Sequence, residues 1–194
     1  MQIKHSLIVG LAAILLSGCY TQKKSLEAAG AAYQKFNWPE EYQPEASRFF
    51  VFNEIEIAAP PQVVWEHLVR AEEWPGWYPG AEEVVIQKPG GAELDAGSVF
   101  DWRTMGLRFT SVVRECGAPY RLSWESSRGA IRGYHSWLIE PTEKGCRVMT
   151  AESQKGWLTF LEKTFQPRKL HRLHGIWLMN LKERSESALK EMSP

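Results

Sequence analysis

The feature that most constrains this chain is a long run of β-strand signals followed by a single helical stretch. From residue 82 to residue 153, alternating apolar and polar residues recur in segments bounded by Gly, Pro and Ser. The same alternation from Phe49 to Ile57 adds one strand before this run. The predicted strands cover residues 49–57, 82–87, 97–104, 107–115, 120–126, 132–140 and 146–153. Seven strands joined by short turns predict an antiparallel sheet.

Two helical regions accompany the strands. Pro60-Pro61 is a favoured helix start, and the apolar face that follows ends at Trp74–Gly80, where the chain turns back. Residues 158–189 carry Leu, Phe and Trp near the helical period, and Pro167 is expected to kink or split this helix. Because a sheet of this kind has one solvated face and must cover the other, we expect the long helix to lie across it and leave a gap between the layers.

Several segments resemble a known family in their order and spacing. They are Glu54–Pro60 with Val64-Trp65, Trp74–Gly80, Arg121–Trp124, Gly133–His135, Leu138–Pro141, Gly145–Val148, and Glu152 with Gly156. The chain over residues 50–190 resembles the helix-grip fold of the START-domain and plant-allergen superfamily (SRPBCC), in the group called polyketide cyclase/dehydrase and lipid transport. The resemblance implies an α+β fold, with a seven-stranded curved antiparallel sheet wrapped around a long C-terminal helix and two short helices after the first strand. The resemblance constrains the architecture, including a cavity, more than it constrains the chemistry of the site, because the family holds carriers as well as enzymes.

The first 18 residues are typical of a secretory signal peptide. An apolar stretch from Ser6 to Leu16 is too short to span a bilayer, since a spanning helix takes about 20 residues. Leu16-Ser17-Gly18-Cys19 resembles the lipobox of bacterial lipoproteins, in which the Cys is acylated and becomes the new N-terminus. The resemblance implies a lipid anchor on Cys19, and Tyr20 in place of Asp favours the outer membrane.

The expected organisation has three parts. Residues 1–18 are the signal peptide, residues 19–45 are the lipidated Cys and a flexible tether, and residues 46–194 are the ligand-binding domain. The expected location is the cell envelope, on the periplasmic face of the outer membrane. The 23 basic and 23 acidic residues give a net charge of zero, which removes the usual electrostatic case for nucleic-acid binding.

Nine Trp residues are more than an ordinary core needs, and they suggest a pocket lined by aromatic side chains. For any one of them, core packing is the alternative. The candidate ligand-binding residues are Trp77, Tyr78, Trp102, Trp124, His135, Trp137, Glu152 and Trp157.

His135 and Glu152 form the most informative pair. If the last hairpin turns through Thr142–Gly145, these residues face each other across two strands, and they share the inner face with Trp137 and its partner Thr150. Such a pair could orient the polar end of a ligand, act as an acid/base couple, or serve a purely structural role.

A basic cluster begins the last part of the C-terminal helix. Its members are Arg168, Lys169, His171, Arg172 and His174. We expect a solvated helix face, with contact to anionic lipid headgroups as the alternative.

The spacing of the Cys and His residues does not match a metal site. The sequence contains no Gly-rich phosphate loop, so it predicts no cofactor. In the strand order that the resemblance implies, Cys116 and Cys146 lie three strands apart, roughly 14 Å. That exceeds the reach of a disulfide unless the loops move, so a disulfide between them stays open at this point.

The expected function is binding or carrying a hydrophobic small molecule, a lipid or an aromatic compound, in an internal cavity. The membrane would be the second partner, through the lipid anchor. One alternative is a cyclase, dehydratase or hydrolase-like enzyme that uses His135 and Glu152. The other is an envelope scaffold whose cavity is filled.

Overall fold

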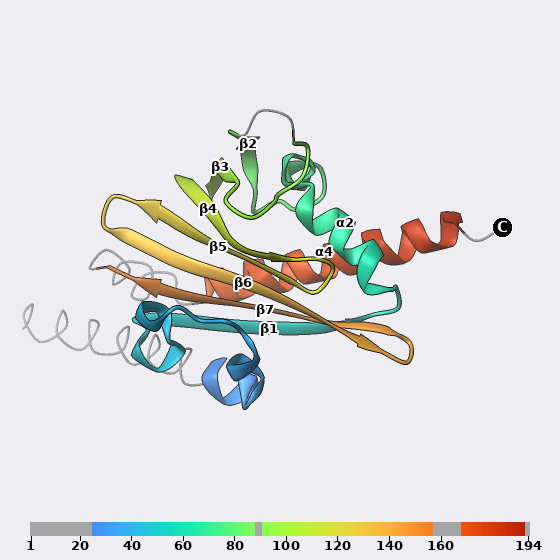
Figure 1. Cartoon of the computed structure of the whole chain (residues 1–194), viewed down its shortest axis with the longest axis horizontal. Coiled ribbons are helices and arrows are strands. Elements are labelled where there is room, and N and C mark those ends of the chain that lie inside the picture. The colour runs from blue at the N-terminus through green and yellow to red at the C-terminus, as the bar shows by residue number, and fades with distance from the viewer. Residues whose placement is uncertain (1–24, 88–90, 157–167, 193–194) are drawn as a thin grey trace, which may run out of the picture.

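The computed structural model describes residues 25–87, 91–156 and 168–192 (Figure 1). Its main elements are β1 (Phe49–Ile57), α2 (Pro61–Val69), the 3-10 helix η4 (Ala71–Gly76), β2 (Glu82–Ile86), β3 (Val99–Thr104), β4 (Leu107–Gly117), β5 (Arg121–Arg128), β6 (Ile131–Thr142), β7 (Gly145–Lys155) and α4 (Lys169–Met192). All seven predicted strands are present. The signal peptide, Cys19, Trp157 and Pro167 lie outside the described residues.

The seven strands form one antiparallel sheet in the order β1-β7-β6-β5-β4-β3-β2. The chain begins α2 at Pro61, whose fixed backbone suits the first helical turn. Figure 1 shows α4 running along the sheet on the side where α2 also lies. This is the helix-grip architecture that the sequence predicted.

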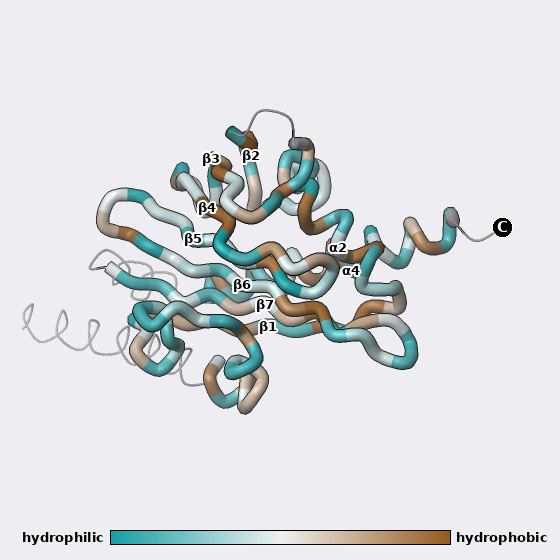
Figure 2. Tube along the Cα trace, in the orientation of Figure 1, coloured by the Kyte–Doolittle hydropathy of each residue, from teal (hydrophilic) through white to brown (hydrophobic). Residues whose placement is uncertain are grey.

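The main core fills the space between the sheet and the two helices. Hydrophobic residues are concentrated in the strands and in α2, whereas the hairpin between β6 and β7 is mostly hydrophilic (Figure 2). The centre of this core is aromatic: Trp74, Trp124, Trp137 and Trp177 are each no more than 2% exposed. No helix in the described part of the chain is long and apolar enough to cross a membrane.

The other face of the sheet is not fully solvated, which differs from the expectation of a flexible tether over residues 19–45. From Ala32 onward the described part of this segment forms three short 3-10 helices, at Ala32–Lys35, Glu40–Tyr42 and Pro44–Ala46. Phe36 is 5% exposed and belongs to a cluster with Phe50 and Phe52 of β1. The segment therefore covers part of the outer face, because its aromatic side chains supply the apolar area that the neighbouring strands need.

Polar contacts fix the same segment to β5. The hydroxyl of Tyr42 donates to Glu125 at 2.7 Å, and Arg114 and Arg132 donate to the same carboxylate at 2.8 and 2.5 Å. Burial raises the pKa of Glu125, but these hydrogen bonds outweigh it and hold the pKa at about 2. The N-terminal segment is thus part of the folded domain.

Cys116 and Cys146 are free cysteines, on β4 and β7. Their strands lie three apart in the sheet order, as expected from the sequence. Three strand spacings, roughly 14 Å, exceed the distance between Cα atoms that a disulfide can span.

Candidate functional site

His135 and Glu152 lie opposite each other on β6 and β7, as the sequence predicted. The same register places Trp137 opposite Thr150. The His135 Nδ1 atom is 3.4 Å from Glu152 Oε2, and the imidazole is 3% exposed. The pair therefore faces the interior of the grip, where a polar cluster needs partners of its own.

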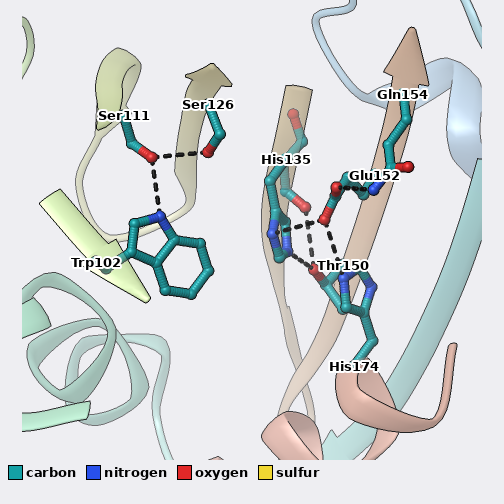
Figure 3. Close-up of polar contacts among 9 residues, drawn as sticks. Trp102, Ser111, Ser126, His135, Thr150, Glu152, Gln154 and His174 are labelled. Carbon is teal, nitrogen blue, oxygen red and sulfur yellow. Dashed lines mark hydrogen bonds and ion pairs between the residues drawn. The ribbon is translucent and has the colours of Figure 1, made fainter. Parts of the chain in front are cut away.

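A third member of this cluster comes from α4. His174 is 1% exposed, and its Nε2 atom lies 3.4 Å from the same Glu152 oxygen (Figure 3). The expectation that His174 belongs to a solvated basic face is wrong. It lies four residues after Leu170 and three before Trp177, so it shares their buried helix stripe, and this spacing could have identified it.

Hydrogen bonds to neighbouring strand residues orient His135 and Glu152. The His135 Nε2 atom lies 2.7 Å from Thr150 Oγ1, and that hydroxyl donates to the carbonyl oxygen of Ser136 at 3.3 Å. Gln154 donates its side-chain N–H to Glu152 Oε1 at 2.8 Å (Figure 3). These contacts leave Nδ1 of His135 and Oε2 of Glu152 directed towards each other.

The surroundings give the cluster a negative carboxylate and a neutral imidazole. Burial and then the neighbouring His174 lower the pKa of His135 to about 3, against the effect of Glu152. Burial raises the pKa of Glu152, but contacts with His174, His135 and Gln154 outweigh it and hold the pKa below its usual range. At neutral pH His135 is therefore uncharged and Glu152 is ionised.

A pocket opens beside this cluster. Its free volume is about 30 Å³, which is room for about two water molecules. The lining residues that the structure describes include no Lys or Arg; they are Tyr78, Trp102, Thr104, Met105, Phe109, Trp124, Ser126, Ile131, Gly133, His135, Glu152, Gln154, Leu170, His174 and Trp177. The expected wide gap between sheet and helix is much narrower among the described residues, because bulky indole rings fill it.

The predicted aromatic residues divide between this pocket and other places. Tyr78, Trp102 and Trp124 line the pocket. Trp137 is in the core beneath it, with its ring stacked on His135 at a centroid distance of 5.4 Å. Trp77 does not join them, because it lines a separate open hollow with side chains of α2 and α4.

Two residues that line the pocket carry unpaired indole N–H groups. The indole N–H groups of Trp124 and Trp177 are buried, and neither has a hydrogen-bond partner among the described residues. The Trp102 N–H is already used, since it donates to Ser111 at 3.0 Å (Figure 3). The pocket thus offers one carboxylate acceptor to a bound molecule, whereas the two unpaired indole N–H groups are closed off from its free space.

The cluster also has the donor atoms of a metal site. One ligand atom from each of His135, Glu152 and His174 lies within 4.8 Å of the other two. Sequence spacing predicted no such set, because the three residues come together only when β6, β7 and α4 pack.

Similar proteins share this architecture. The structure of the hypothetical protein jhp0584 from Helicobacter pylori has 25% sequence identity and a TM-score of 0.72, over 77% of this chain and 95% of that one. The di-domain aromatase/cyclase StfQ of the steffimycin biosynthetic pathway has 14% identity and a TM-score of 0.62, over 73% of this chain and 52% of that one. A norcoclaurine synthase point mutant from Thalictrum has 16% identity and a TM-score of 0.57, over 74% and 96%. The last two show a shared fold alone.

None of the curated proteins compared with the chain matches it. A family model does match, over residues 50–186, which spans the chain from β1 to most of α4. The strand order, the long helix across the sheet and this match agree, and the chain therefore belongs to the polyketide cyclase/dehydrase and lipid-transport family.

Proposed function

We propose that this chain is a lipid-anchored envelope protein whose helix-grip domain binds a small hydrophobic molecule carrying one polar group. The observation that carries the proposal is the Glu152 carboxylate, held ionised by its contacts, on the wall of an aromatic pocket whose described lining contains no Lys or Arg. Apolar walls with a few convergent polar groups are the usual form of a small-molecule site. The envelope location rests on the lipobox-like sequence that ends at Cys19.

The pocket chemistry favours a hydroxyl group over a carboxylate on the ligand. A hydroxyl can donate to the Glu152 carboxylate, which is the acceptor that the pocket offers. A ligand carboxylate would instead face the charge of Glu152, and like charges at close range repel more strongly inside a protein than in bulk water. The small free volume favours a ligand that enters by its polar end, with its apolar part at the mouth.

Two molecules that differ only in the polar group test this proposal. We expect the full chain, treated with EDTA and kept in mild detergent, to bind p-cresol at least about 10-fold more tightly than p-toluate in calorimetric titrations, since a hydrogen bond to a charged group contributes about 1.5–3 kcal/mol. Glu152→Gln should remove most of this preference. Glu56→Gln, which changes an exposed glutamate on β1, should leave it intact. Equal or tighter binding of p-toluate would refute the proposed ligand chemistry.

An enzyme that uses His135 and Glu152 is the second candidate, and the 3.4 Å contact between them is the observation in its favour. A general base works best when its pKa lies near the working pH. Because burial lowers the pKa of His135 to about 3, this imidazole is a weak base at neutral pH. The site therefore supports binding better than acid/base chemistry.

A further inference from the structure

Three side chains with metal-binding atoms converge from three different elements on the wall of the pocket. We infer that His135, Glu152 and His174 form a binding site for one divalent transition-metal ion, with zinc as the metal that this ligand set fits. This inference concerns the protein's own side chains, and it does not depend on the proposed small-molecule ligand. Both imidazoles are nearly fully buried, so the cluster is a built site rather than a chance group of surface residues.

The distances match those of a zinc site. Glu152 Oε2 lies 3.4 Å from His135 Nδ1 and 3.4 Å from His174 Nε2. Ligand atoms that each lie about 2.1 Å from a tetrahedral zinc ion are roughly 3.4 Å from one another. A ligand atom from each of the three residues lies within 4.8 Å of the others, so a small movement of the two imidazoles completes the triangle.

The hydrogen bonds of His135 and Thr150 leave two acceptors, His135 Nδ1 and the Glu152 carboxylate, that face each other. The Thr150 hydroxyl has one proton, which it donates to Ser136 O, so it accepts the Nε2–H of His135. The Nδ1 atom of neutral His135 then presents a lone pair to the Glu152 carboxylate at 3.4 Å. Two acceptors facing each other call for a cation between them. Metal-binding histidines commonly donate their second N–H to a fixed acceptor in this way.

His174 is the ligand that can adjust. Neither of its ring nitrogens has a hydrogen-bond partner among the described residues, although Nε2 contacts Glu152. Its ring lies 4.6 Å from that of His135 at an angle of 20°. Since a metal binds in the plane of each imidazole, one ring must turn, and His174 can do so without breaking a hydrogen bond. The adjacent 30 Å³ leaves room for a water ligand.

The donor set indicates which metals fit. Imidazole nitrogen suits zinc, copper, iron and nickel, whereas magnesium and calcium prefer sites made only of oxygen atoms. Two histidines and one glutamate, with a fourth position left for water, are a known zinc arrangement. Zinc is therefore the ion to test, and cobalt(II) is its spectroscopic substitute.

The test is a zinc titration of the full chain in mild detergent after EDTA treatment, by competition with a chromophoric chelator. We expect one zinc ion per chain, a higher thermal unfolding midpoint with zinc, and visible d–d absorption when cobalt(II) replaces it. His135→Gln, Glu152→Gln and His174→Gln should each weaken binding by at least about 100-fold. Thr150→Val keeps all three ligands and should weaken it about 10- to 100-fold, because it removes the partner that orients His135.

Two control variants separate this site from incidental binding. His171→Gln removes an exposed imidazole from the same helix, and Cys116→Ser removes a partly exposed thiol, so both should bind zinc as the wild type does. Near-ultraviolet circular dichroism of each variant checks that it is folded. The inference is overturned if the wild type takes up no zinc, or if folded Thr150→Val and the three ligand variants bind it as tightly as the wild type. The cluster would then be held by a shared proton, and the p-cresol titration in EDTA would be unaffected.

Discussion

Trp177→Ala should lower the free energy of unfolding by about 3–5 kcal/mol, the range found when a large buried aromatic side chain is removed from a core. Trp177 is 1% exposed, and its ring lies 4.2 Å from Tyr78, 5.0 Å from Trp74 and 5.1 Å from Trp137, measured between centroids. It thus joins α4 to η4 and to the sheet, and its loss leaves a cavity that the surrounding indoles cannot close.

Urea unfolding followed by circular dichroism measures this change. Met179→Ala is the matched control, because Met179 lies two residues further along α4 and is 49% exposed. It should change the stability by no more than about 0.5 kcal/mol. A loss below 1 kcal/mol for Trp177→Ala would mean that α4 does not pack on the sheet through this residue.

Phe36→Ala should destabilise the protein by about 3 kcal/mol. Phe36 is 5% exposed against the outer face of the sheet, in a cluster with Phe50 and Phe52, and its ring lies 5.7 Å from that of Trp38. The effect should be seen as an earlier urea midpoint. Exposure of the outer face should also increase binding of a hydrophobic dye, since the cluster would then be open to solvent.

Gln34→Ala is the control for this segment, because Gln34 lies two residues away and is exposed. It should leave the urea midpoint unchanged. If Phe36→Ala behaved in the same way, the described part of residues 19–45 would be a flexible tether, as the sequence alone suggested.

Strand positions and register could be predicted from the sequence because both depend on local patterns. The alternation in β6 and β7 and the short turn at Thr142–Gly145 fix which residues face each other, and they gave the His135–Glu152 pair correctly. Side chains alternate between the two faces of a strand, so the same register also placed the pair inside. Here the local pattern and the tertiary structure agree.

What the sequence did not reveal depends on contacts between distant elements. The sequence placed His174 on a basic helix face because it follows Arg168, Lys169, His171 and Arg172, yet its own position falls in the buried stripe. The segment around Phe36 has no helical or strand period, so its place on the sheet could not be read from a pattern. The free volume of the pocket depends on how indoles from three elements, β3, β5 and α4, pack together.

The narrow pocket leaves a real alternative to ligand binding, namely an envelope scaffold whose interior is filled by its own side chains. The two accounts differ in whether a molecule occupies the space beside Glu152. Gly133 provides a way to close that space, because a Cβ atom there would lie 3.0 Å from Glu152 Oε1 and 3.7 Å from Gln154 Cγ. Gly133→Val should therefore displace a ligand. Ser127→Val is the matched control, because it introduces the same valine side chain at an exposed position on β5, away from the pocket.

The measurement that tests this account most directly is native mass spectrometry of the full chain, extracted in mild detergent from the cells that produce it. We predict a reproducible added mass on the wild type and on Ser127→Val, identified after extraction as a small molecule with a hydroxyl group, and no added mass on Gly133→Val. Wild-type protein without any added mass, or the same mass on Gly133→Val, would contradict ligand binding at this pocket and favour the scaffold.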